Sequence, residues 1–174
     1  VCSAYNADFD GDTMSVHVPL TPEAQLEAEL LMKASAHVLA PSSGRPIVTP
    51  TRDIVLGCYY LTCEAPEPAG SADQEPVRTI SGFDEAILMQ QLGYLELHEP
   101  IRIRDRSGSI IETTLGRIVF NETLPPEIPF KNDLFTHKKL EELVAEIFHK
   151  CGYERTAAFL DSIKELGFEY ATRG

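Results

Sequence analysis

The densest group of chemically competent side chains in the sequence is a set of three aspartates, Asp8, Asp10 and Asp12, spaced two residues apart. Carboxylates placed so closely repel one another unless a cation neutralises them. Mg²⁺ requires oxygen ligands in octahedral geometry at about 2.0–2.1 Å. The spacing alone leaves two interpretations open, a divalent-cation site and a solvated acidic turn, because short motifs often match by chance.

The backbone of this motif must bend if the three carboxylates are to share one ion. In an extended strand, with about 3.3 Å of rise per residue, the α carbons of Asp8 and Asp12 would lie about 13 Å apart. Aspartate side chains are too short to meet across that gap. Gly11 permits the backbone conformations that a tight curl requires, so we expect the loop to curl around the ion.

Two other metal-dependent classes share part of the pattern. An EF-hand loop counted from Asp8 needs glycine at its sixth position and glutamate at its twelfth, where this chain has Thr13 and Pro19. A phosphohydrolase of the haloacid dehalogenase type would use Asp8 as nucleophile and Asp10 as acid/base. That class needs a hydrophobic strand before the motif, and residues 2–6 (Cys-Ser-Ala-Tyr-Asn) do not supply one.

The bulk composition is that of an ordinary globular protein. The chain has 174 residues, 43% of them hydrophobic, and a net charge of −12, which is the wrong sign for a free-standing nucleic-acid binder. It contains no apolar run long enough to span a membrane, and its four cysteines lack disulfide-framework or zinc spacing. The first residue is Val1 rather than methionine, which suggests a piece of a longer polypeptide.

Apolar periodicity and capping residues predict the elements that position the motif. A half-buried strand is expected at residues 14–18, followed by a helix from Thr21 to Ala36 and a shaped loop at 41–46. Further helices are expected from about residue 51, at 83–92, at 114–122, at 138–151 and at 154–166, and strands at 77–80, 95–104 and 109–114. Gly152 and Gly167 are read as helix stops, residues 106–108 as a hairpin turn, and the acidic, proline-rich segment 64–76 as the main internal boundary. The fold class is mixed α+β.

The residues around the motif resemble the active-site signature of the largest subunit of multisubunit RNA polymerases, most closely the bacterial beta-prime version. The resemblance rests first on residues 6–12 (Asn-Ala-Asp-Phe-Asp-Gly-Asp), Met14 and residues 17–20. It continues through residues 44–50 (Gly-Arg-Pro-Ile-Val-Thr-Pro), 53–57, 59–62, 113–117 and 166–173. It covers nearly the whole chain and loosens between about residues 64 and 112. Thr13 and Arg52 depart from the family pattern, which often has glutamine at both positions.

This resemblance implies a fold and a division of the chain. Residues 1–64 would be the C-terminal part of a double-psi β-barrel that carries the active site, truncated at its N-terminal side. Residues 65–130 would form an α+β segment of the pore region, and residues 131–174 a helical segment leading to the funnel region, with two C-terminal helices.

The resemblance also implies a chemistry and its residues. Asp8, Asp10 and Asp12 would be the catalytic residues and the ligands of a permanently bound Mg²⁺, and Asn6 would contact the ribose of the incoming nucleotide. A second Mg²⁺ would arrive with the nucleotide. The activity would be DNA-templated RNA synthesis, the transfer of ribonucleotides to the RNA 3′ end, and the isolated chain is expected to be inactive.

The implied partners are the beta subunit, the alpha dimer, omega, a sigma factor, the DNA template, the RNA transcript and ribonucleoside triphosphates. No membrane partner is expected, and the location would be cytoplasmic and nucleoid-associated. Two alternatives stay open: a non-catalytic, polymerase-like binding module that keeps the acidic loop, and, less favoured, a magnesium-dependent phosphohydrolase.

Overall fold

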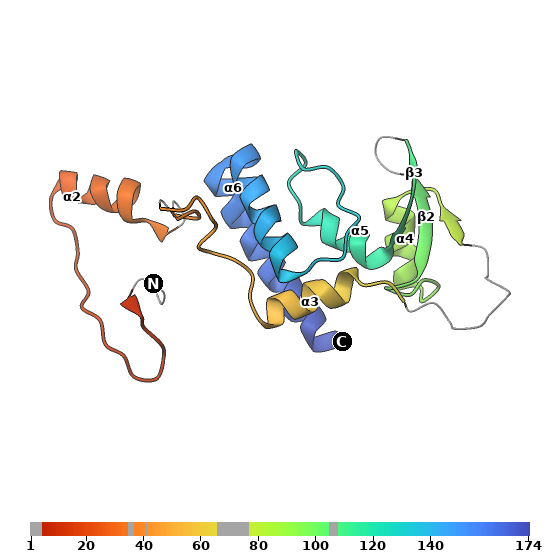
Figure 1. Ribbon diagram of the computed structural model, residues 1–174, viewed down its shortest axis with the longest axis horizontal. Helices are drawn as coiled ribbons and strands as arrows, with labels where there is room; N and C mark the ends of the chain where they lie inside the picture. The colour runs from red at the N-terminus through yellow and green to blue at the C-terminus, as the bar shows by residue number, and fades with distance from the viewer. Residues whose placement is uncertain (1–4, 35–36, 41, 66–76, 105–107) are drawn as a thin grey trace. The chain divides into compact units, whose positions relative to one another are not determined.

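The computed structural model describes residues 5–34, 37–40, 42–65, 77–104 and 108–174 (Figure 1). Its internal contacts divide the chain into two units, residues 1–36 and residues 37–174. The predicted boundaries at 64/65 and 130/131 both fall inside the second unit. The assignment of residues 1–64, 65–130 and 131–174 to active-site, pore and helical segments stays a prediction.

The helical stretch of residues 22–32 in the first unit begins where the capping signal predicted. Helix α2 (Pro22–Glu27) continues into the π-helical turn η1 (Ala28–Met32). The hydroxyl of Thr21 accepts a hydrogen bond from the backbone N–H of Ala24 at 3.2 Å, which satisfies one of the free donors of the first turn. Lys33 leaves the helical conformation (φ −61°, ψ 123°), so the helix ends short of the predicted residue 36.

The strand predicted at residues 14–18 is wrong, because these residues form no hydrogen-bonded ladder and their side chains are exposed. A strand is stable only where a neighbouring strand satisfies its backbone groups. The described part of the first unit contains no such neighbour, so the alternating pattern of residues 14–18 is left without a partner.

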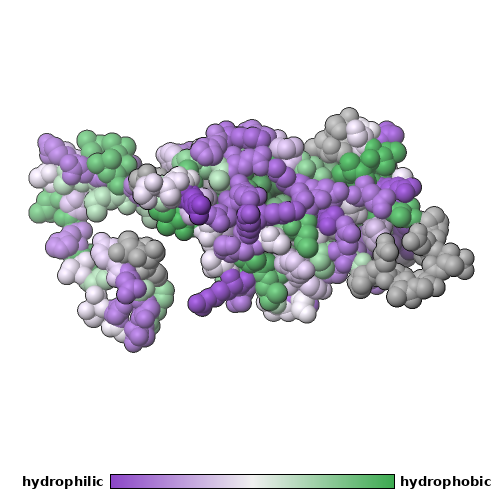
Figure 2. Space-filling model, viewed as in Figure 1, coloured by the Kyte–Doolittle hydropathy of each residue, from purple (hydrophilic) through white to green (hydrophobic). Residues whose placement is uncertain are grey.

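The first unit exposes an unusual amount of apolar surface. None of its described residues is fully buried, and Phe9 is 96% exposed. Figure 2 shows apolar side chains on the surface of the α2–η1 helix. The large apolar side chains exposed in this unit are Tyr5, Phe9, Met14, Val16, Val18, Leu20, Leu26, Leu30, Leu31 and Met32. The apolar face predicted for the helix is therefore present but does not pack against a core within the unit.

The second unit has its larger core between three helices. These are α3 (Asp53–Thr62), α5 (Leu115–Glu122) and α6 (His137–Arg173), and α3 packs against both of the others. Complete burial of a large aliphatic or aromatic side chain contributes about 1.5–3 kcal/mol. The buried side chains of this core are Val38, Cys58, Leu61, Phe120, Ile128, Phe135, Leu140, Leu143, Val144, Ile147, Phe159, Ile163 and Tyr170. No helix among the described residues is both long enough and apolar enough to cross a membrane.

A three-stranded sheet forms the rest of the second unit, as the mixed α+β class predicted. Its order is β1 (Arg78–Ile80), β2 (Pro100–Arg104) and β3 (Ile110–Thr114). Helix α4 (Phe83–Gln91) connects β1 to the parallel strand β2, and β3 pairs antiparallel with β2. A second core lies between the sheet and its helices. It consists of Ile80, Ala86, Leu95, Ile101, Ile103, Leu115 and Ile118.

Strand β2 is shorter than the predicted range of 95–104 because the backbone before Pro100 pairs elsewhere. The carbonyl of Leu97 accepts from the N–H of Gly116, and the carbonyl of His98 accepts from the N–H of Ala65, both at 3.0 Å. These two bonds tie residues 97 and 98 to α5 and to the segment that follows α3 instead of to a strand. The predicted turn at residues 106–108 falls mostly outside the described residues.

Helix α6 corrects one of the two predicted helix stops. Gly152 has φ 79° and ψ 179°, and it separates α6 into the two predicted helical halves. Gly167 is not a stop, because the helix continues through it to Arg173. A Cβ atom at Gly167 would lie 2.8–2.9 Å from atoms of Ile54, and one at Gly57 would lie 1.8 Å from the carbonyl oxygen of Gly167. These glycines let the backbones of α3 and α6 touch.

A buried arginine joins α3, α5 and the segment before α6. Arg117 is only 7% exposed, and its Nε donates to the carbonyl of Thr62 at 3.1 Å. Its Nη1 donates to Oδ1 of Asn132 at 3.2 Å and pairs with Glu64 at 2.7 Å. The hydroxyl of Thr62 accepts in turn from the N–H of Phe135 at 3.0 Å. This network satisfies polar groups that would otherwise be buried without partners.

We expect Gly57→Ala to destabilise the second unit by about 1–3 kcal/mol or more, because the new methyl group would overlap the backbone of α6. Urea unfolding followed by circular dichroism measures the change. Gly82→Ala is the matched control, because Gly82 is extended and has open space around its Cβ position. Equal unfolding midpoints for the two variants would contradict the close contact of α3 with α6.

We expect Arg117→Met to reduce the free energy of unfolding by about 1–3 kcal/mol, because it leaves the buried carbonyl of Thr62 without the donor that Arg117 supplies. Chemical denaturation of both proteins at neutral pH gives this difference.

The control is Arg102→Met, which breaks an exposed ion pair with Glu112 (3.2 Å) on neighbouring strands. Exposed pairs contribute about 0–1 kcal/mol. A loss as small for Arg117→Met as for this control would show that the buried network is not needed for stability.

Candidate metal-binding site

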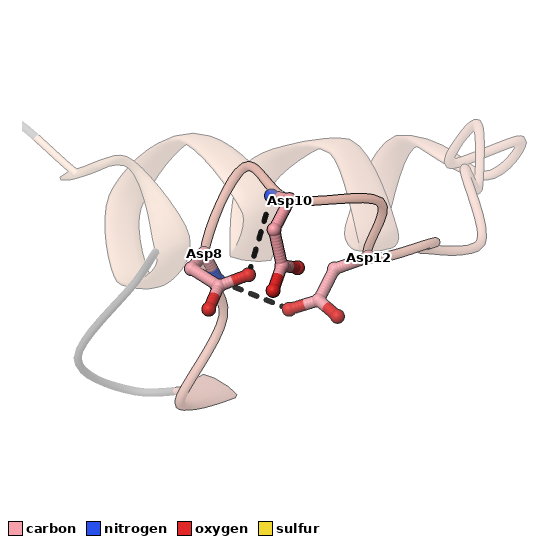
Figure 3. Close-up of side chains that lie close together, drawn as sticks. All are labelled: Asp8, Asp10 and Asp12. Carbon is pink, nitrogen blue, oxygen red and sulfur yellow. Dashed lines mark hydrogen bonds between the residues drawn. The ribbon is translucent and has the colours of Figure 1, made fainter.

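The loop over residues 8–12 brings the three predicted aspartates together. One carboxylate oxygen each from Asp8, Asp10 and Asp12 lies within 4.8 Å of the other two. Figure 3 shows the three side chains projecting from a single curl of backbone toward a common point. The curl that the spacing demanded is therefore confirmed, and all three side chains are exposed to solvent.

Hydrogen bonds from the backbone stabilise this curl. The N–H of Asp8 donates to Oδ2 of Asp12 at 3.0 Å, and the N–H of Asp10 donates to Oδ1 of Asp8 at 3.3 Å (Figure 3). Gly11 has φ 134°, a conformation that residues with a side chain rarely adopt. The backbone thus turns its N–H groups toward the carboxylates and offsets part of their mutual repulsion.

Asn6 lies two residues before the curl. It has φ 49°, in the left-handed region where asparagine is one of the few tolerated residues with a side chain. Its side chain is exposed, and within the described part of the chain it makes no hydrogen bond to the three aspartates. Asn6 thus precedes the aspartate loop along the chain and has an exposed side chain.

Asp8 and Asp10 titrate as a pair because their carboxyl groups face each other. A hydrogen bond between the two side chains raises the pKa of Asp10 above its ordinary value, since the proton lies on Asp10. Accepting the same bond, with a backbone N–H as second donor, lowers the pKa of Asp8. When both carboxyl groups are ionised, their negative charges repel each other. A cation bound between them would neutralise that repulsion.

The donor set fits a small, hard divalent cation. In an octahedral shell with bonds of about 2.1 Å, oxygen ligands stand about 3.0 Å apart when adjacent and about 4.2 Å apart when opposite. The three observed oxygens lie within 4.8 Å of one another, slightly wider than the spacing of this shell. Three carboxylates with no nitrogen or sulfur ligand favour magnesium, calcium or manganese over zinc.

Comparison with protein families assigns both units of the chain. The family model described as RNA polymerase Rpb1, domain 3, matches residues 37–174, and the model described as RNA polymerase Rpb1, domain 2, matches residues 1–34. The chain belongs to the RNA polymerase Rpb1 family. The two matches meet where the contacts of the chain separate its two units, and the aspartate loop lies in the part that matches domain 2.

Curated relatives match the chain over its whole length. It is 49% identical to the DNA-directed RNA polymerase subunit beta′ of Desulforudis audaxviator (strain MP104C), an alignment that covers 100% of this chain and 15% of that protein. It is 45% identical to the subunit beta′ of Moorella thermoacetica, with 99% of this chain and 14% of that protein covered. For the subunit beta′ of Syntrophomonas wolfei the identity is 44%, and the coverages are 99% and 16%. The chain thus spans about one seventh of the length of these relatives.

We expect divalent-cation binding to the loop to weaken as the pH falls, because ligation requires ionised carboxylates. The raised pKa of Asp10 means that this loss begins at a higher pH than for an ordinary aspartate, which titrates near about 3.9. Titration of the chain with Mn²⁺, followed by electron paramagnetic resonance at neutral pH and at about pH 5, measures the change.

The variant Asp10→Asn should bind Mn²⁺ more weakly by about tenfold or more at neutral pH and should show a smaller dependence on pH. Asp161→Asn, a change of equal charge on the exposed face of α6, serves as the control. Equal affinities for these two variants would exclude the loop as the binding site.

Proposed function

We propose that this chain is part of the catalytic subunit of a DNA-directed RNA polymerase and that Asp8, Asp10 and Asp12 hold its catalytic Mg²⁺. The observation that carries this proposal is the convergence of the three carboxylates on one side of a curled loop. That loop lies in a segment that matches Rpb1 domain 2, in a chain 44–49% identical to proteins named as subunit beta′.

The aspartates bind and orient, and they do not react. Asp8, Asp10 and Asp12 supply negative charge and oxygen ligands, and backbone N–H groups hold two of these carboxylates in place. When bound there, Mg²⁺ supplies a Lewis acid that lowers the pKa of the RNA 3′-hydroxyl and so favours its attack on the α-phosphate of the nucleotide. No covalent intermediate with the chain is needed, because positioning and charge neutralisation lower the barrier.

Asn6 is the proposed substrate-contacting residue. An amide offers both a donor and an acceptor, which suits the hydroxyl groups of the ribose of an incoming nucleotide. The nucleotide substrate would bring a second Mg²⁺ with its phosphates. The support from the structure is the position of Asn6 directly before the aspartate loop and the exposure of its side chain.

The apolar surface of the first unit supports the proposal that residues 1–64 include part of a double-psi β-barrel. Exposed apolar area is unfavourable by about 25 cal/mol per Å² relative to its burial. Residues 14–18 keep the alternation of a half-buried strand, and their neighbours expose side chains such as Phe9 and Leu20. Strands from a longer polypeptide would give these residues both hydrogen-bond partners and a core.

The proposed partners follow from the same assignment. They are the beta subunit, the alpha dimer, omega and a sigma factor, together with the DNA template, the RNA transcript and ribonucleoside triphosphates, in the cytoplasm at the nucleoid. Residues 65–130 and 131–174 would contribute to the pore and to the helical segment that leads to the funnel. The net charge of −12 favours the proposal that the basic surfaces that grip nucleic acid lie mostly on other parts of the enzyme.

In the complete polymerase, we expect Asp10→Ala to reduce RNA synthesis by more than about a hundredfold, because a metal ion contributes several kcal/mol to the barrier reduction. Assembly of the enzyme should be unchanged. A primed transcription assay on a purified, fully assembled enzyme measures this effect. The control Asp161→Ala should retain activity, and near-normal elongation by Asp10→Ala would exclude the proposed role.

We also expect residues 1–174 alone to be inactive in template-dependent RNA synthesis and in hydrolysis of p-nitrophenyl phosphate. RNA synthesis by the isolated chain would show that the proposed dependence on other parts of the polymerase is wrong. Magnesium-dependent phosphate release that is lost in Asp8→Asn would favour the phosphohydrolase alternative instead.

A further inference from the structure

The second unit contains a cavity that the proposed function does not use. Its volume is about 580 Å³, which is in the range of cavities that bind ligands or anchor side chains. It lies between the start of α4, the end of α5 and the segment of residues 124–130. Its apolar walls include Phe83, Ile118, Leu124, Pro125, Pro129 and Phe130. None of the residues that line it belongs to the aspartate loop.

The apolar walls of the cavity are held in place by packing and by hydrogen bonds within the fold. The rings of Phe83 and Phe130 stack with their centroids 5.8 Å apart. The side chain of Asn121 donates to the carbonyls of Arg117 and Lys131 at 2.7 and 2.8 Å, and it accepts from the N–H of Lys131 at 2.7 Å. These bonds occupy the amide of Asn121 and fasten the segment after α5 to the end of that helix.

The charge of the cavity has one sign. Asp84 and Glu122 are its charged lining residues, and both side chains are exposed. Neither forms an ion pair or a side-chain hydrogen bond with any described residue. Other acids close by in the sequence do have partners: Glu85 accepts from Ser81, and Glu127 pairs with Arg155. The two carboxylates of the cavity are thus left for a ligand of positive charge.

We propose that this cavity is a docking site for a basic segment of another polypeptide, which inserts one apolar or aromatic side chain between α4 and α5. The aromatic and proline walls would take the apolar side chain, and Asp84 and Glu122 would pair with lysine or arginine residues on either side of it. An arginine can also stack on an exposed aromatic ring while it pairs with a carboxylate. The proposal goes beyond the polymerase activity and does not depend on it.

Charge complementarity selects this occupant over the other classes of macromolecule. Nucleic acids and anionic membranes present phosphates, which the two carboxylates and the overall charge of −12 would repel. An acidic peptide meets the same repulsion. A basic peptide is attracted over a distance of about 10 Å at moderate salt. A peptide with an apolar side chain would also bury that side chain in the cavity and would bind more tightly than one held by charge alone.

The test measures binding of two fluorescein-labelled peptides to the 174-residue chain by fluorescence anisotropy. The first has the sequence Arg-Lys-Phe-Arg-Lys, and the second replaces its phenylalanine with glycine. We expect the phenylalanine peptide to bind at least about tenfold more tightly, because only its ring can be buried in the cavity. Equal affinities would overturn the proposal, since they would show attraction by net charge without insertion.

The double variant Asp84→Asn/Glu122→Gln should weaken binding of the phenylalanine peptide by about tenfold or more, because charge-assisted hydrogen bonds are lost. The control Glu142→Gln/Glu165→Gln makes the same change of net charge at exposed positions of α6, and it should weaken binding by less than about twofold. An equal effect of the two double variants would overturn the proposal. Thermal unfolding establishes that each variant is folded. If a double variant is unfolded, the single variants Asp84→Asn and Glu122→Gln replace it in the binding measurement.

Discussion

Close contact between helix backbones determines the architecture of the second unit. A Cβ atom at Gly116 would lie 1.8 Å from the carbonyl oxygen of Leu61, and one at Gly57 would lie equally close to that of Gly167. Helix α3 is therefore held between α5 and α6 with no side chain separating the backbones. At this distance the guanidinium of Arg117 reaches the carbonyl of Thr62 at the end of α3, and the buried network becomes possible. The cavity between α4 and α5 in turn depends on where this contact places α5.

The aspartate loop has a different physical character. Its geometry comes from a few residues of local sequence, with backbone N–H groups directed at carboxylates and a glycine in a conformation that other residues avoid. Three negative charges on one exposed curl repel one another, and the hydrogen bond between the two carboxyl groups shifts the pKa values of Asp8 and Asp10 in opposite directions. Carboxylates that could bind a cation dominate the loop, whereas contacts between helix backbones and buried apolar side chains hold the second unit together.

Sequence reasoning succeeded where short-range rules decide the structure. The capping hydroxyl of Thr21, the helix from Phe83, and the strands that end at Ile80 and Thr114 all follow from local patterns. It failed where a distant contact decides. Residues 14–18 have the pattern of a strand but no neighbour in the described part of the first unit, and Gly167 looks like a helix stop although it is a contact with α3. A glycine placed for close packing and one placed to end a helix are identical in sequence.

The sequence by itself determined the identity and spacing of the three aspartates, the need for a curl around them, and the resemblance that led to the polymerase family, because these features reside in consecutive residues. Only the tertiary structure decided that Arg117 is a buried hub and that Asp84 and Glu122 lie at one cavity without ion-pair partners. Asp84 and Glu122, like Arg117 and its partner Thr62, are separated by tens of positions along the chain. Their proximity arises from the packing of α3, α4 and α5, which no local pattern encodes.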